Sequence, residues 1–176
     1  HLLAQFNCSS IPKLEPFPQK GLLQFYIDED LGTCTEDPTN TNGFRILYIP
    51  EVTPYDEEHQ FSIEKLPPPK DGFPIDPTVT LALEFTKKVM PISPSDGKYH
   101  IVYDKFLSNP ELRDDFEDFY STLCDKSWCN KLGGYPSFCN YDLRENMTEK
   151  YDFLLFQIQS GKHVFLYDGV INFFIN

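Results

Sequence analysis

The sequence contains few basic residues and no long apolar run. Fifteen Lys and Arg stand against 27 Asp and Glu, which gives a formal net charge of −12. An acidic chain repels a phosphate backbone, so we expect no nucleic-acid partner. No apolar run approaches the ~18 residues of a membrane span, and no charged-then-apolar leader opens the chain. These absences predict a cytoplasmic protein that does not bind membranes.

The motifs of the common enzyme classes are also absent. The chain has no Gly-rich phosphate loop, no His-Glu-x-x-His zinc helix and no Gly-x-Ser-x-Gly nucleophile elbow. His59, His100 and His163 are scattered, and a Cys/His nucleophile pair needs a spatial adjacency that sequence does not show. We therefore predict no catalytic residue. A hydrolase-like enzyme of unassigned type stays open as the alternative to a binding protein.

The cysteines form an odd and irregular set of five in a chain too large to need disulfide staples. This usage favours a reducing compartment. Cys124, Cys129 and Cys139 could in principle gather a zinc ion with His163, but the Cys-x4-Cys spacing is loose and lacks a paired knuckle. We expect ordinary thiols, no metal and no cofactor.

Aromatic residues, in contrast, are abundant. They make up 15% of the chain, with 16 Phe and 10 Tyr, and both types favour strands over helices. A chain of 176 residues fits one domain that buries about two-thirds of its unfolded surface. We predict a single α+β domain, residues 1–176, with a mixed, largely antiparallel sheet and few helices.

A two-strand pattern occurs twice. The first copy spans residues 2–7 and 21–28, and the second spans 154–159 and 169–176. Six residues recur as identical residues in the second copy: Leu2, Leu3, Gln5, Gly21, Phe25 and Ile27. The sheet is therefore predicted to be built from a duplicated two-strand unit. The two related sheet units, about 1–49 and 130–176, are expected to occupy equivalent, pseudo-twofold positions.

Alternation along the strands predicts one apolar face and one face that carries amides. Leu2, Ala4 and Phe6 are expected on the core face. Exposed amides with aromatics suit recognition of a peptide or a small polar ligand, because they donate and accept without a charge to desolvate. The candidate ligand-binding residues are Gln5, Asn7, Gln24, Tyr26, Gln157, Gln159 and Asn172. The alternative is structural, with the amides satisfying buried backbone groups.

Other strands are predicted from runs of strand formers. Residues 44–49 should form a third strand that Pro50 stops, and residues 79–85 should form a long one. A short edge strand is expected at 61–63.

One helix is predicted to begin after Asn109, which is a suitable N-cap, with Pro110 at the first helical position. Its apolar stripe should face the core, with partner binding as the alternative. The stripe consists of Leu112, Phe116, Phe119, Tyr120 and Leu123.

The run Gly133-Gly134-Tyr135-Pro136 predicts a shaped structural turn. Adjacent glycines permit positive φ, and the proline restricts the backbone where the chain leaves the turn. The turn stands about twenty residues before the second copy of the repeat. An equivalent turn before the first copy would lie upstream of His1, so we expect that the chain is trimmed there.

Four stretches together resemble the YwqG-like family, a widespread bacterial family of domains of unknown function. They are residues 2–28, the strand 44–48 leading into Pro50-Glu51, the turn 132–136 and the closing unit 154–176. The resemblance implies an α+β fold on a mixed, largely antiparallel sheet and transfers no catalytic residue. Family members carry an earlier Gly-Gly-x-Pro turn and a tail, so the resemblance implies that both ends are trimmed.

Taken together, the residues favour a binding or interaction module over an enzyme. The partner is expected to be a basic protein or a small polar ligand. One version is an immunity-like protein that masks a basic toxin or regulator, whose association would then be salt-sensitive. The sequence does not indicate an oligomeric state.

Overall fold

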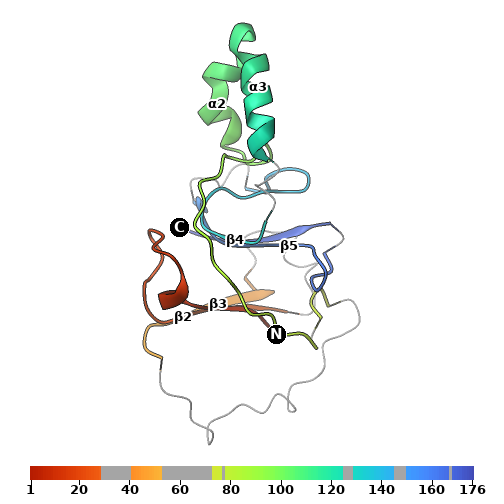
Figure 1. The fold of residues 1–176 in the computed structure, drawn as a ribbon. Coiled ribbons are helices and arrows are strands. Elements are labelled where there is room, and N and C mark those ends of the chain that lie inside the picture. Colours follow the sequence, from red (N-terminus) through yellow and green to blue (C-terminus); the bar gives the residue numbers. More distant parts are fainter. Residues whose placement is uncertain (29–40, 53–72, 77, 125–128, 145–149, 167) are drawn as a thin grey trace, which may run out of the picture. The chain divides into compact units, whose positions relative to one another are not determined.

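The computed structural model describes residues 1–28, 41–52, 73–76, 78–124, 129–144, 150–166 and 168–176 (Figure 1). The chain forms two compact units, His1–Lys87 and Lys88–Asn176. Each unit contains a three-stranded antiparallel sheet, and the described residues include two α-helices. The predicted α+β fold with few helices is confirmed. That the whole chain is one domain stays a prediction.

The N-terminal unit contains three of the strands that the sequence predicts there. They are β1 (Leu2–Asn7), β2 (Leu22–Ile27) and β3 (Phe44–Ile49), in the order β1-β2-β3. Phe6, Leu23 and Phe25 are buried on one face, because paired and alternate residues of a sheet share a side. The rings of Phe6 and Phe25 meet edge to face at 5.6 Å. This face forms the apolar side of the unit.

The sheet of the C-terminal unit has the order β4-β5-β6. Its strands are β4 (Lys131–Leu132), β5 (Phe153–Gln159) and β6 (Val170–Ile175). Five successive residues of β5, 154–158, are buried, so both faces of this strand are covered. Phe156 and Phe173 stack across β5 and β6 with ring centroids 6.0 Å apart. The second sheet is thus more enclosed than the first.

The hairpins β1–β2 and β5–β6 have the same register, including one irregularity at the same place. In both, the pairing shifts across the second leucine of the Leu-Leu pair, which is the signature of a β-bulge. The matching pairs are Leu2↔Tyr26 with Leu154↔Phe174, and Gln5↔Gln24 with Gln157↔Asn172. Equivalent sequence positions therefore have equivalent positions in their own sheets. A pseudo-twofold arrangement of the units stays a prediction.

The bulge corrects one sequence prediction. Leu2 lies opposite Tyr26, on the face of the amides, and is 49% exposed. The expectation that it joins Ala4 and Phe6 on the core face is wrong, because the irregularity reverses the alternation between Leu2 and Ala4.

The third strand of each sheet lies beside a different strand of the hairpin. β3 pairs with the second hairpin strand, β2, whereas β4 pairs with the first, β5. Consequently the outer edge of β5 is paired. Among the described residues no strand pairs with the outer edge of β1, the equivalent strand.

Helices α2 (Tyr99–Leu107) and α3 (Pro110–Cys124) form a hairpin in the C-terminal unit. The predicted start of α3 is confirmed, because Asn109 Oδ1 accepts a hydrogen bond from the Glu111 N–H at 3.0 Å. No pattern in the sequence predicted α2. Tyr99 and Tyr120 are buried with their rings 5.3 Å apart, and Phe116 packs against them. Aromatic packing therefore joins the two helices.

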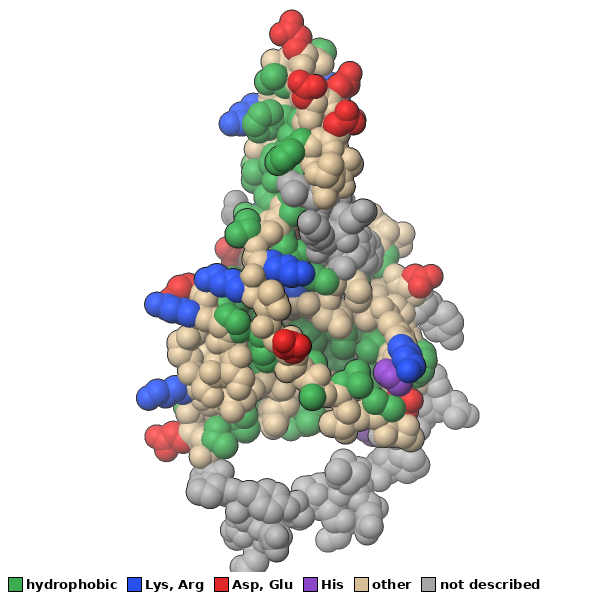
Figure 2. Space-filling view, viewed as in Figure 1, with side chains coloured by type: hydrophobic (Ala, Val, Ile, Leu, Met, Phe, Trp, Pro, Cys, Tyr) green, Lys and Arg blue, Asp and Glu red, His purple; other side chains and the backbone are tan. Residues whose placement is uncertain are grey.

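The apolar stripe of α3 is only partly buried. Phe119 is 64% exposed and Leu112 is 43% exposed, so the prediction that both face the core is wrong. Within the described residues α3 packs against α2 and Ile92, and a single neighbouring helix covers a narrower stripe than a full core does. Hydrophobic and acidic side chains lie side by side over this hairpin (Figure 2).

Residues 79–85 do not form the predicted strand. They have no regular secondary structure, and Leu81 and Leu83 are each more than half exposed. Alternation alone does not make a strand without a neighbour to accept its hydrogen bonds. The edge strand predicted at 61–63 lies outside the described residues. Neither of the α-helices in the described ranges could span a lipid bilayer.

Candidate functional site

The exposed face of the N-terminal sheet carries a short ladder of polar side chains. Gln24 Nε2 donates to Gln5 Oε1 at 2.5 Å, and the Tyr26 hydroxyl donates to Gln24 Oε1 at 3.0 Å. The Gln5 side chain is exposed, and Gln24 and Tyr26 are half-buried. The ladder crosses β1 and β2, so three predicted site residues lie together.

The strand β3 extends this face with a cation and an apolar side chain. Arg45 lies opposite Tyr26, and Leu47 lies opposite Gln24 and is 38% exposed. We call the face bearing Leu2, Gln5, Gln24, Tyr26, Arg45 and Leu47 the open face. It combines amides, an aromatic ring and apolar groups, which is a composition suited to contact with a polypeptide.

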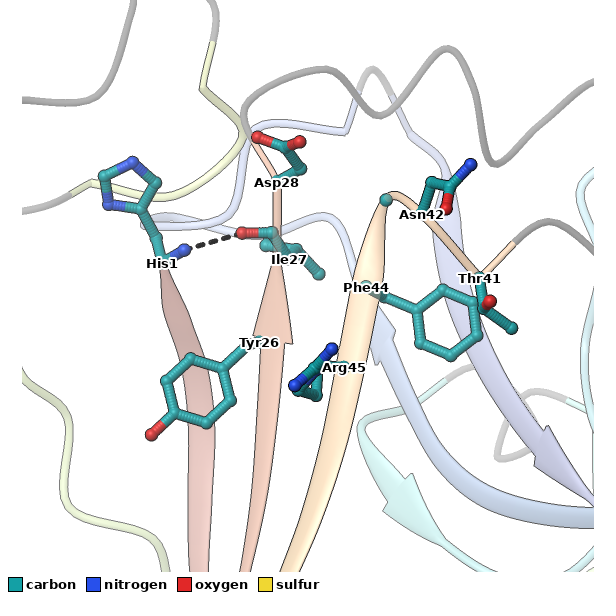
Figure 3. A pocket seen from close by; sticks show the side chains of 9 residues that line it. His1, Tyr26, Ile27, Asp28, Thr41, Asn42, Phe44 and Arg45 are labelled. Atoms are coloured by element: carbon teal, nitrogen blue, oxygen red, sulfur yellow. Dashed lines mark hydrogen bonds between the residues drawn. The ribbon is translucent and has the colours of Figure 1, made fainter.

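A depression of about 400 Å³ lies at one end of this sheet (Figure 3). Its lining includes Tyr26 and Arg45, so it continues the open face. Asp28 and His1 also line it. The depression therefore offers both signs of charge beside an aromatic ring.

Asn7 has a local structural role. Its Oδ1 accepts from the Ser9 N–H at 3.1 Å and from the Ser9 hydroxyl at 2.7 Å. These bonds cap the short 3-10 helix η1 (Cys8–Ser10). Ligand binding by Asn7 stays a prediction.

The equivalent amides of the C-terminal sheet are covered. Gln157 is fully buried; its Oε1 accepts from the Ser137 N–H at 2.7 Å, and its Nε2 donates to Cys129 O at 2.9 Å. Asn172 Nδ2 donates to Ser137 O at 2.9 Å. This is the structural role that the sequence left open as the alternative. At the strand end, the Gln159 N–H donates to Asn130 Oδ1.

One segment, residues 131–138, covers this face, and we call it the cover segment. It begins as β4 on the edge of β5, and Gly133 and Gly134 then turn the chain with φ values of 68° and 74°. Such positive φ is open to glycine and strained for other residues. Pro136 and Ser137 follow, both buried. The predicted turn thus leads the backbone onto Gln157 and Asn172.

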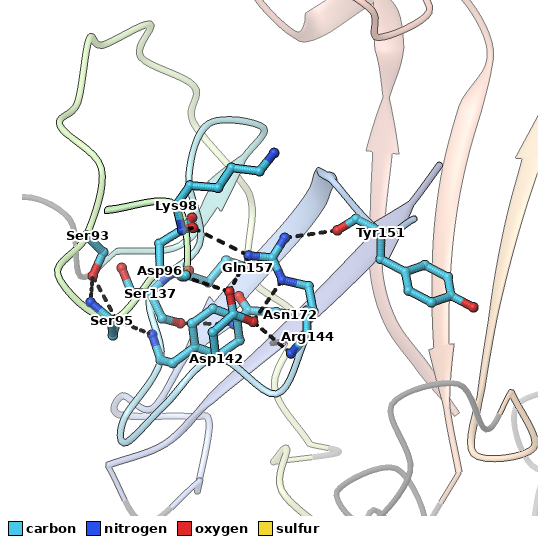
Figure 4. A network of polar contacts seen from close by, with 12 residues as sticks. Ser93, Ser95, Asp96, Lys98, Ser137, Asp142, Arg144, Tyr151, Gln157 and Asn172 are labelled. Atoms are coloured by element: carbon cyan, nitrogen blue, oxygen red, sulfur yellow. Dashed lines mark hydrogen bonds and ion pairs between the residues drawn. The ribbon is translucent and has the colours of Figure 1, made fainter. Parts of the chain in front are cut away.

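A buried ion pair lies beside the cover segment (Figure 4). Arg144 Nε and Nη2 donate to the two carboxylate oxygens of Asp142 at 2.9 and 2.7 Å. Arg144 Nη1 donates to Tyr151 O, and its guanidinium lies 4.3 Å from the centre of the Phe174 ring. Phe174 is the equivalent of Tyr26, so Arg144 covers the position that Tyr26 leaves open.

The two carboxylates near Arg144 have opposite pKa shifts. Burial raises the pKa of Asp96, whose Oδ1 lies 3.6 Å from Arg144 Nη2. Burial alone would also raise the pKa of Asp142, but hydrogen bonds from Arg144 and Gly97 outweigh it and lower that pKa. Asp96 Oδ2 and Asn172 Oδ1 are buried without a hydrogen-bond partner among the described residues. The hydrogen bonding is therefore complete around Asp142 and incomplete at Asp96 Oδ2 and Asn172 Oδ1.

Two side chains beside this network have the chemistry of a nucleophile and its base. Ser137 would be the nucleophile and Lys131 the base. Lys131 Nζ donates to Ser137 Oγ at 3.4 Å, and burial lowers the pKa of Lys131. A lysine with a lowered pKa can activate a serine. Ser137, however, has no exposed surface. A substrate has no access to its hydroxyl in this conformation.

Cysteine and histidine do not gather into a metal site in the described ranges. No three His, Cys, Asp or Glu side chains lie close enough there to hold a metal ion. Cys129 and Cys139 are free thiols, and Cys139 Sγ donates to Asp168 O.

Comparison with known proteins identifies the family. No curated protein is significantly similar to this chain. The model of a family described as a domain of unknown function, DUF1963, matches residues 1–176. Because the match covers the whole sequence, the chain belongs to the DUF1963 family.

Proposed function

We propose that the chain is a binding module that recognises a partner protein through the open face of β1–β2–β3. The observation that carries this proposal is the difference between two equivalent hairpins. Gln157 is fully buried under the cover segment, whereas Gln5 is exposed. Leu154 is likewise fully buried, whereas Leu2 is 49% exposed.

The open face can exchange its internal hydrogen bonds for bonds to a partner. Gln24 donates to Gln5 across β1 and β2, and Tyr26 donates to Gln24. Water can replace either of these two bonds. A bound backbone would accept and donate in the same places, and the two amides carry no charge that must be desolvated. Burial of Leu2 and Leu47 would add an apolar contribution of about 25 cal/mol per Å².

The charge of the chain supports a basic partner. The net charge is −12, and α3 alone carries five carboxylates beside its exposed apolar residues. We propose that this acidity steers a basic protein toward the module in the cytoplasm, as an immunity-like protein would mask a toxin or regulator. We also propose that the chain is one of the bacterial YwqG-like proteins.

Binding by matched variants tests the proposal. A double variant, Gln24→Ala with Tyr26→Ala, removes the ladder, and Gln19→Ala removes an exposed glutamine outside the open face. A basic protein captured from the native cell at low salt should bind wild type and Gln19→Ala equally. It should bind the double variant at least about tenfold more weakly. Equal binding by all three proteins would overturn the proposal.

An enzyme of hydrolase-like type is the second candidate, because of Lys131 and Ser137. A fluorophosphonate probe labels activated serines. The binding proposal expects no labelling, since Ser137 is fully buried. Labelling that disappears in Ser137→Ala and falls in Lys131→Met would favour the enzyme instead.

A further inference from the structure

Apolar side chains line one side of the α2–α3 hairpin without being buried. The rings of Phe106 and Phe116 stack with their centroids 5.2 Å apart, so the two helices meet on this side. Val102 lies one turn before Phe106 on α2. Leu112 and Phe119 lie one turn on either side of Phe116 on α3, and all three of these outer residues are exposed. We call the side bearing Val102, Phe106, Leu112 and Phe119 the hairpin face.

A row of carboxylates borders the hairpin face on α3. At about 100° per residue, Glu111, Asp115 and Asp118 fall beside Leu112 and Phe119, on the side away from α2. All three carboxylates are exposed, and no basic side chain of the described ranges forms an ion pair with them. Figure 2 shows the acidic side chains next to the apolar ones on this hairpin. The hairpin face is thus an apolar surface with a negative edge.

The α2 edge of the hairpin face has the opposite charge. Lys105 follows Val102 by three residues, and its Nζ lies 4.7 Å from the centre of the Phe106 ring. The two long edges of the face therefore differ, which gives a bound helix a preferred orientation.

Charge decides which occupant suits this face. α3 carries five carboxylates and a single basic residue, Arg113. A second copy of the chain would bring the same excess of negative charge, and an anionic membrane would be repelled. A basic helix with one apolar stripe matches the face, because it can bury apolar side chains in the groove and place cations along the carboxylates.

We propose that the hairpin face docks an amphipathic helix of a partner protein whose basic residues lie along one flank. The apolar stripe of that helix would pack on Val102, Leu112 and Phe119, and its basic flank would lie along the carboxylate row of α3. This is the partner-binding role that the sequence left open for α3. Because the hairpin face lies in the C-terminal unit, its binding does not depend on the open face of β1–β2–β3.

A model helix supplies the probe. A fluorescent peptide of about 18 residues, or about five turns, is built from Leu and Lys with all leucines on one stripe, and is titrated into the chain. Anisotropy should show saturable binding at physiological salt. A peptide of the same composition with its leucines spread around the helix should bind at least about tenfold more weakly, and so should one with Glu in place of Lys. Absence of saturable binding would overturn the proposal.

Two matched pairs of substitutions on α3 test the carboxylate row. Asp115→Asn with Asp118→Asn should weaken binding about fivefold, which is the effect of losing two exposed ion pairs. Asp114→Asn with Glu117→Gln removes the same charge from exposed positions on the opposite side of α3, and should change binding less than about twofold, because salt screens the more distant charges. Equal weakening by both pairs would mean that the peptide responds to net charge alone, and would overturn the proposal.

The apolar contact is tested separately. Phe119→Ala should weaken binding at least about tenfold, because it removes the most exposed aromatic ring of the hairpin face. Phe165→Ala removes an exposed ring outside both helices and should have no effect. Circular dichroism confirms that each variant keeps its helices. Equal binding by wild type and Phe119→Ala would contradict docking on this face.

Other occupants have their own readouts. A dimer in sedimentation velocity that Phe119→Ala dissociates would assign the face to a second copy and overturn the proposal. The titration is repeated on the chain as the cell makes it, and loss of peptide binding there would mean that the protein covers this face itself.

The two proposals fail in different ways. Gln24→Ala with Tyr26→Ala should leave peptide binding unchanged. If this double variant loses the peptide, the peptide binds the open face, so the hairpin proposal is overturned and the proposed function stands. If the hairpin variants lose the peptide while the double variant keeps its basic protein, the proposed function is overturned and the hairpin proposal stands.

Discussion

At the scale of single residues, the Arg144 ion pair shows how burial and pairing compete. Asp142 accepts two hydrogen bonds from the guanidinium, whereas Asp96 lies 3.6 Å from it. The pKa of Asp142 is lowered and that of Asp96 is raised. The same cation therefore stabilises one buried carboxylate fully and the other incompletely.

The first prediction compares these carboxylates at neutral pH. Asp142→Asn should lower the free energy of unfolding by about 3–5 kcal/mol, because it leaves the buried Arg144 charge without its partner. Asp96→Asn should cost much less, since burial already disfavours the Asp96 charge. Urea denaturation at pH 7 measures both. Equal losses would contradict this assignment of roles.

The second prediction concerns pH. The folded-state pKa of Asp142 lies below its ordinary value of 3.8, so its contribution to stability is complete above pH 3.8 and is lost as pH falls through the folded pKa. The stability gap between wild type and Asp142→Asn should close in that range. For Asp96, whose folded pKa is raised, the cost of its charge is largest at neutral pH. That cost should disappear as pH falls toward 3.8.

The third prediction uses the repeat as its own control. Gln157→Ala should destabilise the protein by about 2–4 kcal/mol, because it leaves the Ser137 N–H and Cys129 O without their partner. Gln5→Ala removes an exposed side chain and should change stability by less than about 0.5 kcal/mol. Thermal unfolding of the two variants tests this difference. A comparable loss in Gln5→Ala would mean that Gln5 is also structural.

At the scale of the elements, a glycine directly precedes the second strand of each hairpin copy, at Gly21 and at Gly169. A Cβ on Gly21 would lie 2.3 Å from Ile49 O, and its φ is 86°. A Cβ on Gly169 would lie 2.6 Å from Leu166 O. Both positions need glycine because a backbone oxygen lies too close for a Cβ atom.

The fourth prediction follows from this crowding. Gly21→Ala should lower the free energy of unfolding by about 1–3 kcal/mol from backbone strain alone, and by more if Ile49 has to move. Gly161→Ala is the matched control, because no atom lies within 4 Å of its Cβ position. Urea denaturation separates the two. Equal effects would show that neither the positive φ nor the crowding at Gly21 has a cost in stability.

At the scale of the whole molecule, the net charge of −12 gives a long-range attraction for cations. The fifth prediction is that association with the basic partner slows as salt rises. The association rate should fall about tenfold or more between 0.02 and 0.5 M NaCl, because screening shortens the range of the acidic field. Stopped-flow fluorescence measures it. A rate that is independent of salt would contradict steering.

Local patterns in the sequence determined the parts of the fold that depend on neighbouring residues. The repeated two-strand pattern predicted β1 and β2, a run of strand formers predicted β3, and the Asn109-Pro110 pair predicted the start of α3. The adjacent glycines predicted the turn before Pro136. The repeat and the turn also indicated a family of domains of unknown function, and the match to the DUF1963 model agrees with that coarser description.

Tertiary structure alone decided which of the repeated positions are covered. Gln5 and Gln157 share the pattern Leu-Leu-x-Gln, yet Gln5 is exposed and Gln157 is fully buried. The difference comes from Ser137, which reaches Gln157 from twenty positions away in the chain. A local pattern carries no information about such a contact. For the same reason the bulge that exposes Leu2, and the absence of a strand at 79–85, depend on partners that the sequence does not identify.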